Sequence, residues 1–395
     1  MPRAVWLLVI GMAVNVTGSS FLWPLNTIYI HDHLGKSLSV AGIVLMLNSA
    51  ASVVGNLFGG YLFDKIGGYK SIIFGIGISL LSVIGLIFWS GWPHYVVFLT
   101  ILGFGSGMVF PSMFAMAGNV WKEGGRRAFN AIYVAQNLGV AIGAALGGFV
   151  ASYSFQLIFW ANAIMYVIFL LIAVLGYKNM QVMEDRLVLK GKEHVDEGHH
   201  RKLVALLVLC IGYLLCWVGY VQWQSTIASY TQEIGISLKQ YSLLWTINGA
   251  MIVIGQPIFN GLINHLNKPI KYSMVVGMGI FILSFVTASF VNGFSGFLLA
   301  MIILTIGEML VWPAVPTVAD QLAPKGKAGL FQGIVNSTAT GGRMIGPFFG
   351  GLLVDLYSMD VLFLFVTVLI IISIFTTISY DQRLSKKQRL VNRAS

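Results

Sequence analysis

Residues 60–70 read GYLFDKIGGYK, a short charged segment between two long apolar runs at about 38–63 and 70–90. Each run is long enough for one membrane-spanning helix, which needs roughly 20 mainly apolar residues. Gly67 favours a tight turn where the two runs meet. The segment therefore predicts two neighbouring membrane helices joined by a short polar loop.

The same alternation of apolar runs and polar breaks continues along the whole chain. Of its 395 residues, 57% are apolar and only 10% are charged, whereas a soluble domain carries about 25% charged residues. This composition excludes a soluble protein and predicts an all-α membrane protein with twelve transmembrane helices. The expected spans are 4–30, 38–63, 70–90, 94–119, 127–152, 156–177, 203–230, 240–264, 271–291, 295–321, 328–354 and 361–380.

The distribution of positive charge predicts the orientation of these spans. The formal net charge is +10, and a cytoplasmic N-terminus places 21 of the 24 Lys and Arg residues in cytoplasmic segments. The outside loops then hold only Lys36 and Lys239. We expect a multi-pass protein of the plasma (inner) membrane with both termini cytoplasmic. The basic charge indicates a lipid bilayer as partner and argues against nucleic acid.

One break is long and rich in charges of both signs, and it divides the spans into six and six. The expected organisation is an N-terminal six-helix half at 1–177, a cytoplasmic linker at 178–202, a C-terminal six-helix half at 203–380 and a basic cytoplasmic tail at 381–395.

The two halves resemble each other at a nearly constant offset. Gly35 meets Gly235 and Asn48 meets Asn248 at an offset of 200, and other small and turn residues follow the same pattern. With six spans in each half, the repeats run in the same direction, which favours a substrate site near mid-membrane between them.

The segment at 60–70 resembles the signature loop of the major facilitator superfamily, G-x-L-x-D-[RK]-x-G-[RK]-[RK]. It departs from that pattern at Gly68 and Tyr69. The resemblance implies two pseudo-symmetric six-helix halves and a gating loop that latches the outward-facing state through Asp64. The alternative is a plain turn whose charges set topology. Asp320, near the cytoplasmic end of the tenth span, is assigned to the gate or to a helix cap. The expected gating residues are Gly60, Asp64, Lys65, Gly67 and Asp320.

Two glycine-rich stretches, GVAIGAALGG from Gly139 and GRMIGPFFGG from Gly342, have the spacing of the family's antiporter motif, G-x-x-x-G-P-x-x-G-G. The resemblance implies the drug:proton antiporter branch, while glycines four apart are equally consistent with close helix packing. The fourth span lacks the family's conserved Arg. The motif residues are Gly139, Gly143, Gly147, Gly342, Gly346, Pro347 and Gly350.

Two ionisable residues fall well inside predicted spans, where charge is costly and usually functional. Glu308 lies in the tenth span and Arg343 in the eleventh, at similar depths. We expect Glu308 to bind and release the coupling proton, with Arg343 beside it favouring the ionised form. The alternative is a static ion pair that fixes one helix against the next.

Aromatic, amide and methionine residues lie on the spans expected to surround the substrate. Aromatic rings and one acid suit lipophilic cations, and methionine suits loosely specified ligands. For each residue alone, helix packing is the better interpretation. The candidate cavity residues are Asn26, Asn48, Met108, Phe110, Tyr133, Gln136, Asn137, Trp223, Gln224, Trp245, Asn248 and Trp312.

These features favour a secondary transporter, a proton-coupled antiporter that exports lipophilic cationic drugs or toxic compounds by alternating access. A sugar or small-metabolite carrier and a lipid flippase of the same fold stay open. A passive channel or a membrane enzyme is less favoured. The sequence has no G-x-x-x-x-G-K-[ST] segment for ATP and no metal-binding spacing, so no cofactor, no metal and no catalytic residue is expected. The chain is expected to act as a monomer on a small-molecule substrate and protons.

Overall fold

The computed structural model describes residues 1–22, 25–178, 180, 199–265, 269–382 and 384. Most of the predicted linker, 178–202, and of the predicted tail, 381–395, lies outside the described residues.

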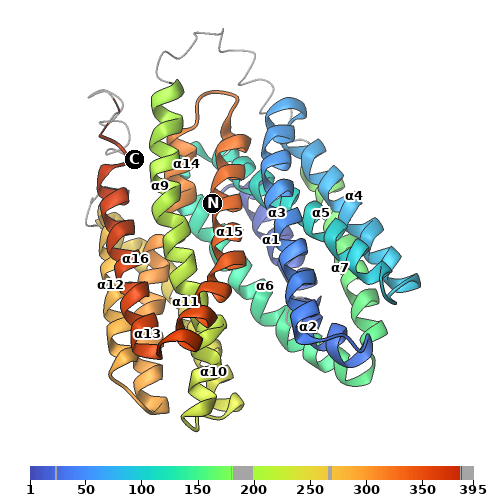
Figure 1. The fold of residues 1–395 in the computed structure, drawn as a ribbon. Coiled ribbons are helices and arrows are strands. Elements are labelled where there is room, and N and C mark those ends of the chain that lie inside the picture. The colour runs from blue at the N-terminus through green and yellow to red at the C-terminus, as the bar shows by residue number, and fades with distance from the viewer. Residues whose placement is uncertain (23–24, 179, 181–198, 266–268, 383, 385–395) are drawn as a thin grey trace. The chain divides into compact units, whose positions relative to one another are not determined.

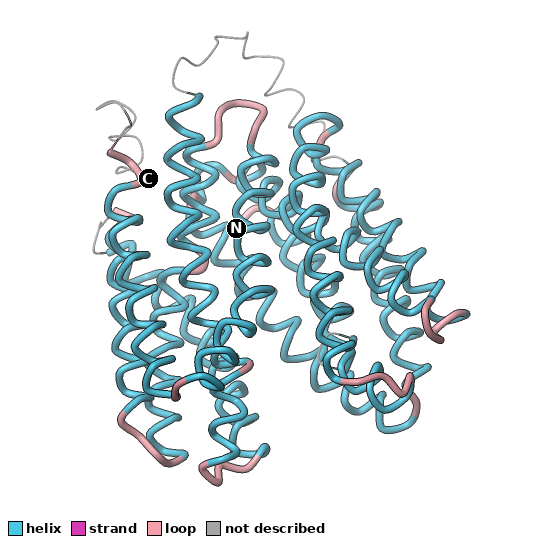
Figure 2. The backbone as a smooth tube through the Cα atoms, in the orientation of Figure 1, coloured by secondary structure: helices cyan, strands magenta, loops and turns pink. Residues whose placement is uncertain are grey.

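All regular elements of the described residues are helical, as Figure 2 shows. The predicted all-α class is therefore confirmed. The helices and helical turns are α1 (Arg3–Leu22), α2 (Asn26–Ile28), η2 (Tyr29–His33), α3 (Leu38–Ile66), α4 (Gly68–Phe88), α5 (His94–Val120), η3 (Lys122–Gly124), α6 (Arg126–Tyr153), α7 (Phe155–Gly176), α9 (His199–Tyr220), η4 (Val221–Gln224), α10 (Thr226–Glu233), α11 (Leu238–His265), α12 (Ile270–Ser289), α13 (Phe294–Val311), α14 (Ala314–Leu322), α15 (Ala328–Leu356) and α16 (Met359–Ser379).

Each predicted span coincides with one long helix or with consecutive helical segments. Within the described parts of the chain, ten helical stretches are long and apolar enough to cross a membrane by length and composition. The other two predicted spans correspond to α11 and α15, which have 28 and 29 residues and a more polar composition. Length alone suffices for both, at about 1.5 Å per residue.

The outward faces of the helices are apolar, as α7 illustrates. Trp160, Ile164 and Leu171 follow one another at spacings of four and seven residues and are exposed, whereas Asn162 and Tyr166 are buried. A soluble helix has the opposite arrangement, with its polar face outward. The apolar exposed face of α7 suits lipid contact.

The turns that start the helices follow from local sequence, and they repeat between the halves. Gly35 and Gly235 have φ values of 63° and 88°, a left-handed conformation that costs glycine little. Ser37, two residues after Gly35, accepts a hydrogen bond from Val40 N at 3.3 Å and caps α3.

The chain forms two compact units. One comprises Met1–Val195 and Lys325–Ser337, and the other comprises Asp196–Pro324 and Thr338–Ser395. Figure 1 shows α15 as one continuous helix. Its first turns group with the N-terminal unit, and the rest of it groups with the C-terminal unit. The predicted boundaries at 1–177 and 203–380 stay a prediction.

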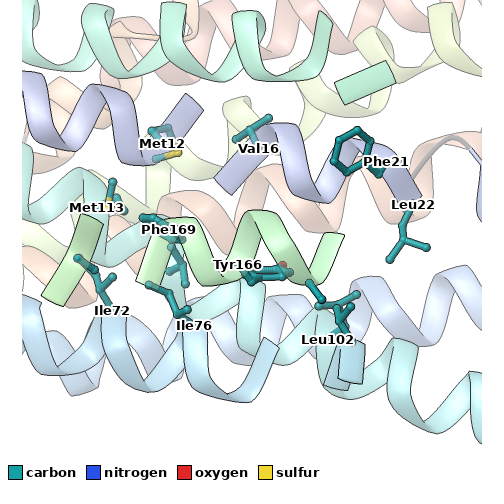
Figure 3. Packing of buried hydrophobic residues seen from close by; sticks show 14 of the residues in the cluster. Met12, Val16, Phe21, Leu22, Ile72, Ile76, Leu102, Met113, Tyr166 and Phe169 are labelled. Carbon is teal, nitrogen blue, oxygen red and sulfur yellow. The ribbon is translucent and has the colours of Figure 1, made fainter. Parts of the chain in front are cut away.

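The core of the N-terminal unit includes apolar side chains from α1, α3, α4, α5, α6 and α7. Figure 3 shows Met12, Ile76, Tyr166 and Phe169 among the residues that meet there, and all four are at most 2% exposed. Lipid would cover these apolar side chains as well as a neighbouring helix does. Their burial therefore stabilises the unit through close packing between helices and not through removal from water.

Candidate functional site

The C-terminal unit holds a buried carboxyl group near the middle of the helical stretch Phe294–Leu322, which is long and apolar enough to cross a membrane. Glu308 lies in the last turn of α13 and is 2% exposed. Asn248 of α11 donates from Nδ2 to Glu308 Oε1 at 2.9 Å and to Thr305 Oγ1 at 2.9 Å. The amide therefore fixes the position of the carboxyl group between two helices of the same unit.

An aromatic cluster adjoins Glu308 through the helix that carries it. Trp312 follows Glu308 by one turn, and its backbone N–H donates to the Glu308 carbonyl at 3.0 Å. The Trp312 ring stacks on Trp217 of α9, with centroids 4.4 Å apart and planes 11° apart. Tyr220 and Tyr213 meet Trp312 edge-on at 5.3 and 5.7 Å. We call these four rings the aromatic cluster.

Arg343 of α15 joins this cluster rather than an acid. Its guanidinium carbon lies 4.9 Å from the centre of a Trp217 ring, and Nη2 donates to Thr340 Oγ1 at 3.4 Å. No ion pair connects Arg343 to Glu308 among the interactions of the described residues. Among the described interactions, each of the two charges that the sequence places at similar depth has its own partners.

In the N-terminal unit, Asp64 caps the first turn of α15. Its Oδ1 accepts from Gly329 N and its Oδ2 from Leu330 N, both at 2.8 Å. The residue that precedes the helix, Lys327, has no acceptor in its side chain, and the first intrahelical bond runs from Phe331 N to Lys327 O. The amides that a helix start leaves without intrahelical partners are thus bound by a carboxylate from α3.

Glycines allow the backbones of α3 and α15 to approach at this point. A Cβ added at Gly60 would lie 2.2 Å from Gly329 O, and one added at Gly333 would lie 2.6 Å from Asn56 O. Farther along the contact, Ser337 donates from Oγ to Val53 O at 2.9 Å. The predicted gating residue Gly60 is therefore a contact point with the start of α15.

Of the other predicted gating residues, Lys65 and Gly67 adjoin Asp64 at the end of α3, and Asp320 belongs to α14. Gly67 has a φ of 84° and ends α3. Lys65 lies over the Tyr61 ring at 4.9 Å. Asp320 lies near the end of α14, where its carbonyl accepts from Ala323 N at 3.2 Å.

The two glycine-rich stretches lie against the first helix of their own unit. A Cβ at Gly143 of α6 would lie 2.4 Å from Thr17 O of α1, and a Cβ at Gly342 of α15 would lie 2.9 Å from Leu214 O of α9. A Cβ added at Gly139 or Gly147 would lie within 3.2 Å of α1, and one added at Gly346 would lie 3.1 Å from Val218 O of α9. A Cβ added at Gly350 would instead meet Gln222 of η4 and Thr226 of α10. Pro347 lies inside α15 beside them. The arrangement fits the packing interpretation of this motif.

The polar groups of several predicted cavity residues form hydrogen bonds within their own unit. Asn26 accepts from Tyr95 Oη at 2.7 Å, and Asn48 donates to Leu99 O at 2.6 Å. Asn137 donates to Tyr133 O at 2.9 Å. These groups stabilise the helix packing around them.

The remaining cavity candidates divide by exposure. Met108 and Trp223 are fully buried, and the Trp223 carbonyl accepts from Tyr241 Oη. Phe110, Gln136 and Trp245 are half-buried, and Gln224 is exposed. Of the predicted cavity residues, the structure brings Asn248 and Trp312 together with Glu308.

Sequence reasoning missed Tyr213, Trp217 and Thr340. Tyr213, Trp217 and Tyr220 are spaced by four and three residues, which places all three on one face of α9. That spacing would have revealed the aromatic face. The contact between Trp217 and Arg343 joins two helices far apart in sequence, so no spacing pattern in the sequence predicts it.

Comparison with known proteins gives consistent matches along the chain. The sequence profile of the Major Facilitator Superfamily matches residues 8–346 and, in a second match, 209–393. The MFS-type transporter YttB of Bacillus subtilis (strain 168) is 59% identical over 395 residues, which cover 100% of this chain and 99% of that protein. The quinolone resistance protein NorA of Staphylococcus aureus (strain MSSA476) is 26% identical over 374 residues, which cover 90% and 91%.

Solved structures show the same fold. A bacterial homologue of the iron transporter ferroportin, in its outward-facing state, has a TM-score of 0.78 and 14% identity, covering 95% of this chain and 99% of that chain. The human organic anion transporter MFSD10 has a TM-score of 0.71 and 14% identity, covering 95% and 100%. At this level of identity the likeness concerns the fold alone.

Proposed function

This chain belongs to the major facilitator superfamily of membrane transporters, and we propose that it is a proton-coupled antiporter that exports lipophilic, cationic aromatic compounds by alternating access. The family consists of transporters rather than enzymes. We also propose that it acts as a monomer in the plasma (inner) membrane, with both termini cytoplasmic, as the positive-inside pattern of its loops favours.

The position of Glu308 is the main support for proton coupling. Its carboxyl group is 2% exposed and is held by Asn248 at 2.9 Å. A carboxyl group in an apolar site binds a proton more readily than one in water, and its charge change there has large electrostatic consequences. Glu308 is therefore suited to alternate between a proton and a cationic substrate.

The aromatic cluster supports the substrate class. Trp217 and Trp312 stack at 4.4 Å, one helical turn from the acid. Stacked rings beside a carboxylate favour flat, aromatic cations through ring stacking and charge attraction. The relatives named as quinolone resistance proteins add support for export of drug-like aromatic compounds by this branch.

Asp64 supplies a gating contact in this proposal. Its two hydrogen bonds to Gly329 N and Leu330 N, both 2.8 Å long, connect α3 to the start of α15. Breaking them frees the first turn of a helix that carries Arg343 near its middle, in the part that groups with the other unit. We propose that these bonds form and break during the transport cycle.

Sugar transport is less well supported by the polar groups of the chain. Asn26, Asn48 and Asn137 each have a hydrogen-bond partner within their own unit, which leaves fewer amides for sugar hydroxyl groups. A small-metabolite carrier or a lipid flippase remains the alternative outcome of the experiment below.

The test is transport by the full chain in proteoliposomes with an imposed pH gradient. The substrates are fluorescent lipophilic cations, and the variants are wild type, Glu308→Gln and Glu233→Gln. Gln at 308 keeps an oxygen that can accept from Asn248 and cannot exchange a proton. Glu233 is exposed at the end of α10, so its variant controls for the loss of one acid.

We expect gradient-driven accumulation in wild type and Glu233→Gln, and its loss in Glu308→Gln with the protein still folded. Full proton-driven transport by Glu308→Gln would refute Glu308 as the coupling group. Absence of movement of every cation by folded wild type would refute the export proposal and favour metabolites or lipids as substrates.

A further inference from the structure

Arg343 is a charged side chain whose described partners leave most of its hydrogen-bonding capacity unused. It lies near the middle of α15 (Ala328–Leu356), roughly 20 Å from either end at 1.5 Å per residue. A guanidinium has five N–H donors, and Thr340 accepts from one of them at 3.4 Å. A charge at this depth is costly, so it is retained where it binds something.

The contacts that the structure describes for Arg343 do not neutralise its charge. Among the described residues these are the Trp217 ring at 4.9 Å and the Thr340 hydroxyl, and neither carries a negative charge. Glu308 accepts a hydrogen bond from Asn248, and no ion pair between Glu308 and Arg343 is among the described interactions. Arg343 is also exposed in this structure, so a ligand can reach its guanidinium.

The guanidinium of Arg343 is itself a cation and already lies over the Trp217 ring. A second cation over Trp217 would meet the guanidinium at close range, and like charges repel strongly where the dielectric constant is low. Guanidinium groups instead bind carboxylates through two parallel hydrogen bonds. The electrostatics at this point of the aromatic cluster therefore favour an anionic group.

We propose that Arg343, Trp217 and Trp312 form an anion-binding subsite that holds the carboxylate of an aromatic substrate. Glu308, one turn from Trp312, provides the opposite charge for an amine or delocalised cation on the same compound. Among cationic aromatic compounds, the favoured substrates are then zwitterions, which carry a carboxylate as well as the cation. The assignment rests on the proposed export function, which it deepens by naming the substrate class.

The test compares two dyes that differ by one methyl group. Rhodamine 110 carries a carboxylate and a delocalised cation, and rhodamine 123 is its methyl ester, with the cation alone. Binding of each to the full-length protein in neutral detergent is followed by fluorescence anisotropy. The variants are Arg343→Gln, Arg343→Lys and Lys239→Gln, which removes an exposed cation at the start of α11 as a control.

We expect wild type and Lys239→Gln to bind the acid about tenfold more tightly than the ester, as one additional charge-assisted contact would give. Arg343→Gln should bind the two dyes equally, and Arg343→Lys should keep part of the preference because it keeps the charge and loses the planar fork. Equal affinities in wild type would overturn the inference without any variant. Displacement of the acid by phosphatidylglycerol, with no displacement by benzoate, would overturn it in favour of a lipid site.

Transport separates this inference from the proposed function. If pH-gradient transport of rhodamine 123 fails while the Arg343-dependent binding preference holds, the subsite stands and the proton-antiport proposal fails. If rhodamine 123 is exported in a Glu308-dependent way and the preference for the acid is absent, the proposed function stands and the subsite is refuted.

Discussion

Replacing Asp64 by Asn tests whether the carboxylate of α3 holds the start of α15. In wild type, both carboxylate oxygens accept hydrogen bonds, one from Gly329 N and one from Leu330 N, each at 2.8 Å. Asn has the same shape and a single acceptor oxygen. One amide then loses its acceptor and faces an NH₂ group, and the other keeps a neutral bond in place of a charged one.

The size of this effect follows from three contributions. Loss of a helix cap costs about 1 kcal/mol. Loss of a negative charge at a helix N-terminus costs about 0.3–1 kcal/mol, and a charged hydrogen bond exceeds a neutral one by roughly 0.5–1 kcal/mol. Because these contributions overlap, we take about 2 kcal/mol for the contact between Asp64 and α15, which corresponds to about a 30-fold change in population.

The assay is hydrogen–deuterium exchange of a peptide that covers the first turn of α15. We expect the amides of Gly329 and Leu330 to exchange about 30-fold faster in Asp64→Asn than in wild type, in line with the free energy above. Asp355→Asn, an exposed change near the other end of the same helix, should leave their exchange unaltered. Unchanged exchange in folded Asp64→Asn would show that the carboxylate does not hold this turn.

Two further predictions concern the contacts around the helix ends. Gly60→Ala places a Cβ 2.2 Å from Gly329 O, so we expect it to loosen the start of α15 and to lower the free energy of unfolding by about 1–3 kcal/mol, measured by thermal unfolding in detergent. Gly42→Ala, on the same helix with nothing within 4 Å, should be neutral or stabilising, and equal effects of the two changes would contradict the packing argument. Lys271→Gln removes the 2.7 Å ion pair with Asp381. The side chain of Lys271 is 26% exposed and that of Asp381 is 9% exposed. We expect a loss of at most about 1 kcal/mol that shrinks in about 1 M salt, and a loss independent of salt would rule out an ion-pair origin.

The main features of the fold could be predicted because they depend on composition and local pattern. Apolar runs of about twenty residues predict membrane helices wherever they occur, whatever the runs pack against. Residues 60–70 and the glycine spacing carried the family resemblance, and the positive φ of both Gly35 and Gly235 fits the internal repeat read from their positions. α11 and α15 are the two predicted spans outside the ten apolar stretches of the described residues, and the glycines of α15 at 342, 346 and 350 lie against other helical segments.

The partners of the candidate site residues could not be predicted. The sequence singled out Glu308 and Arg343 as charges within spans and suggested that they interact directly. The structure instead gives Glu308 the amide of Asn248 and gives Arg343 the ring of Trp217. Depth along a helix is fixed by counting residues, whereas the direction of a side chain around the helix axis depends on which neighbour packs there.

The sequence by itself determined that this chain crosses a membrane many times, which segments do so and which charges lie inside them, since each is a property of a short continuous stretch. Only the tertiary structure decided that Asp64 caps a helix 265 residues later and that Arg343, in the interactions of the described residues, lies over an aromatic ring rather than against an acid. These contacts join segments that are distant in sequence, and their geometry is set by how whole helices pack against each other.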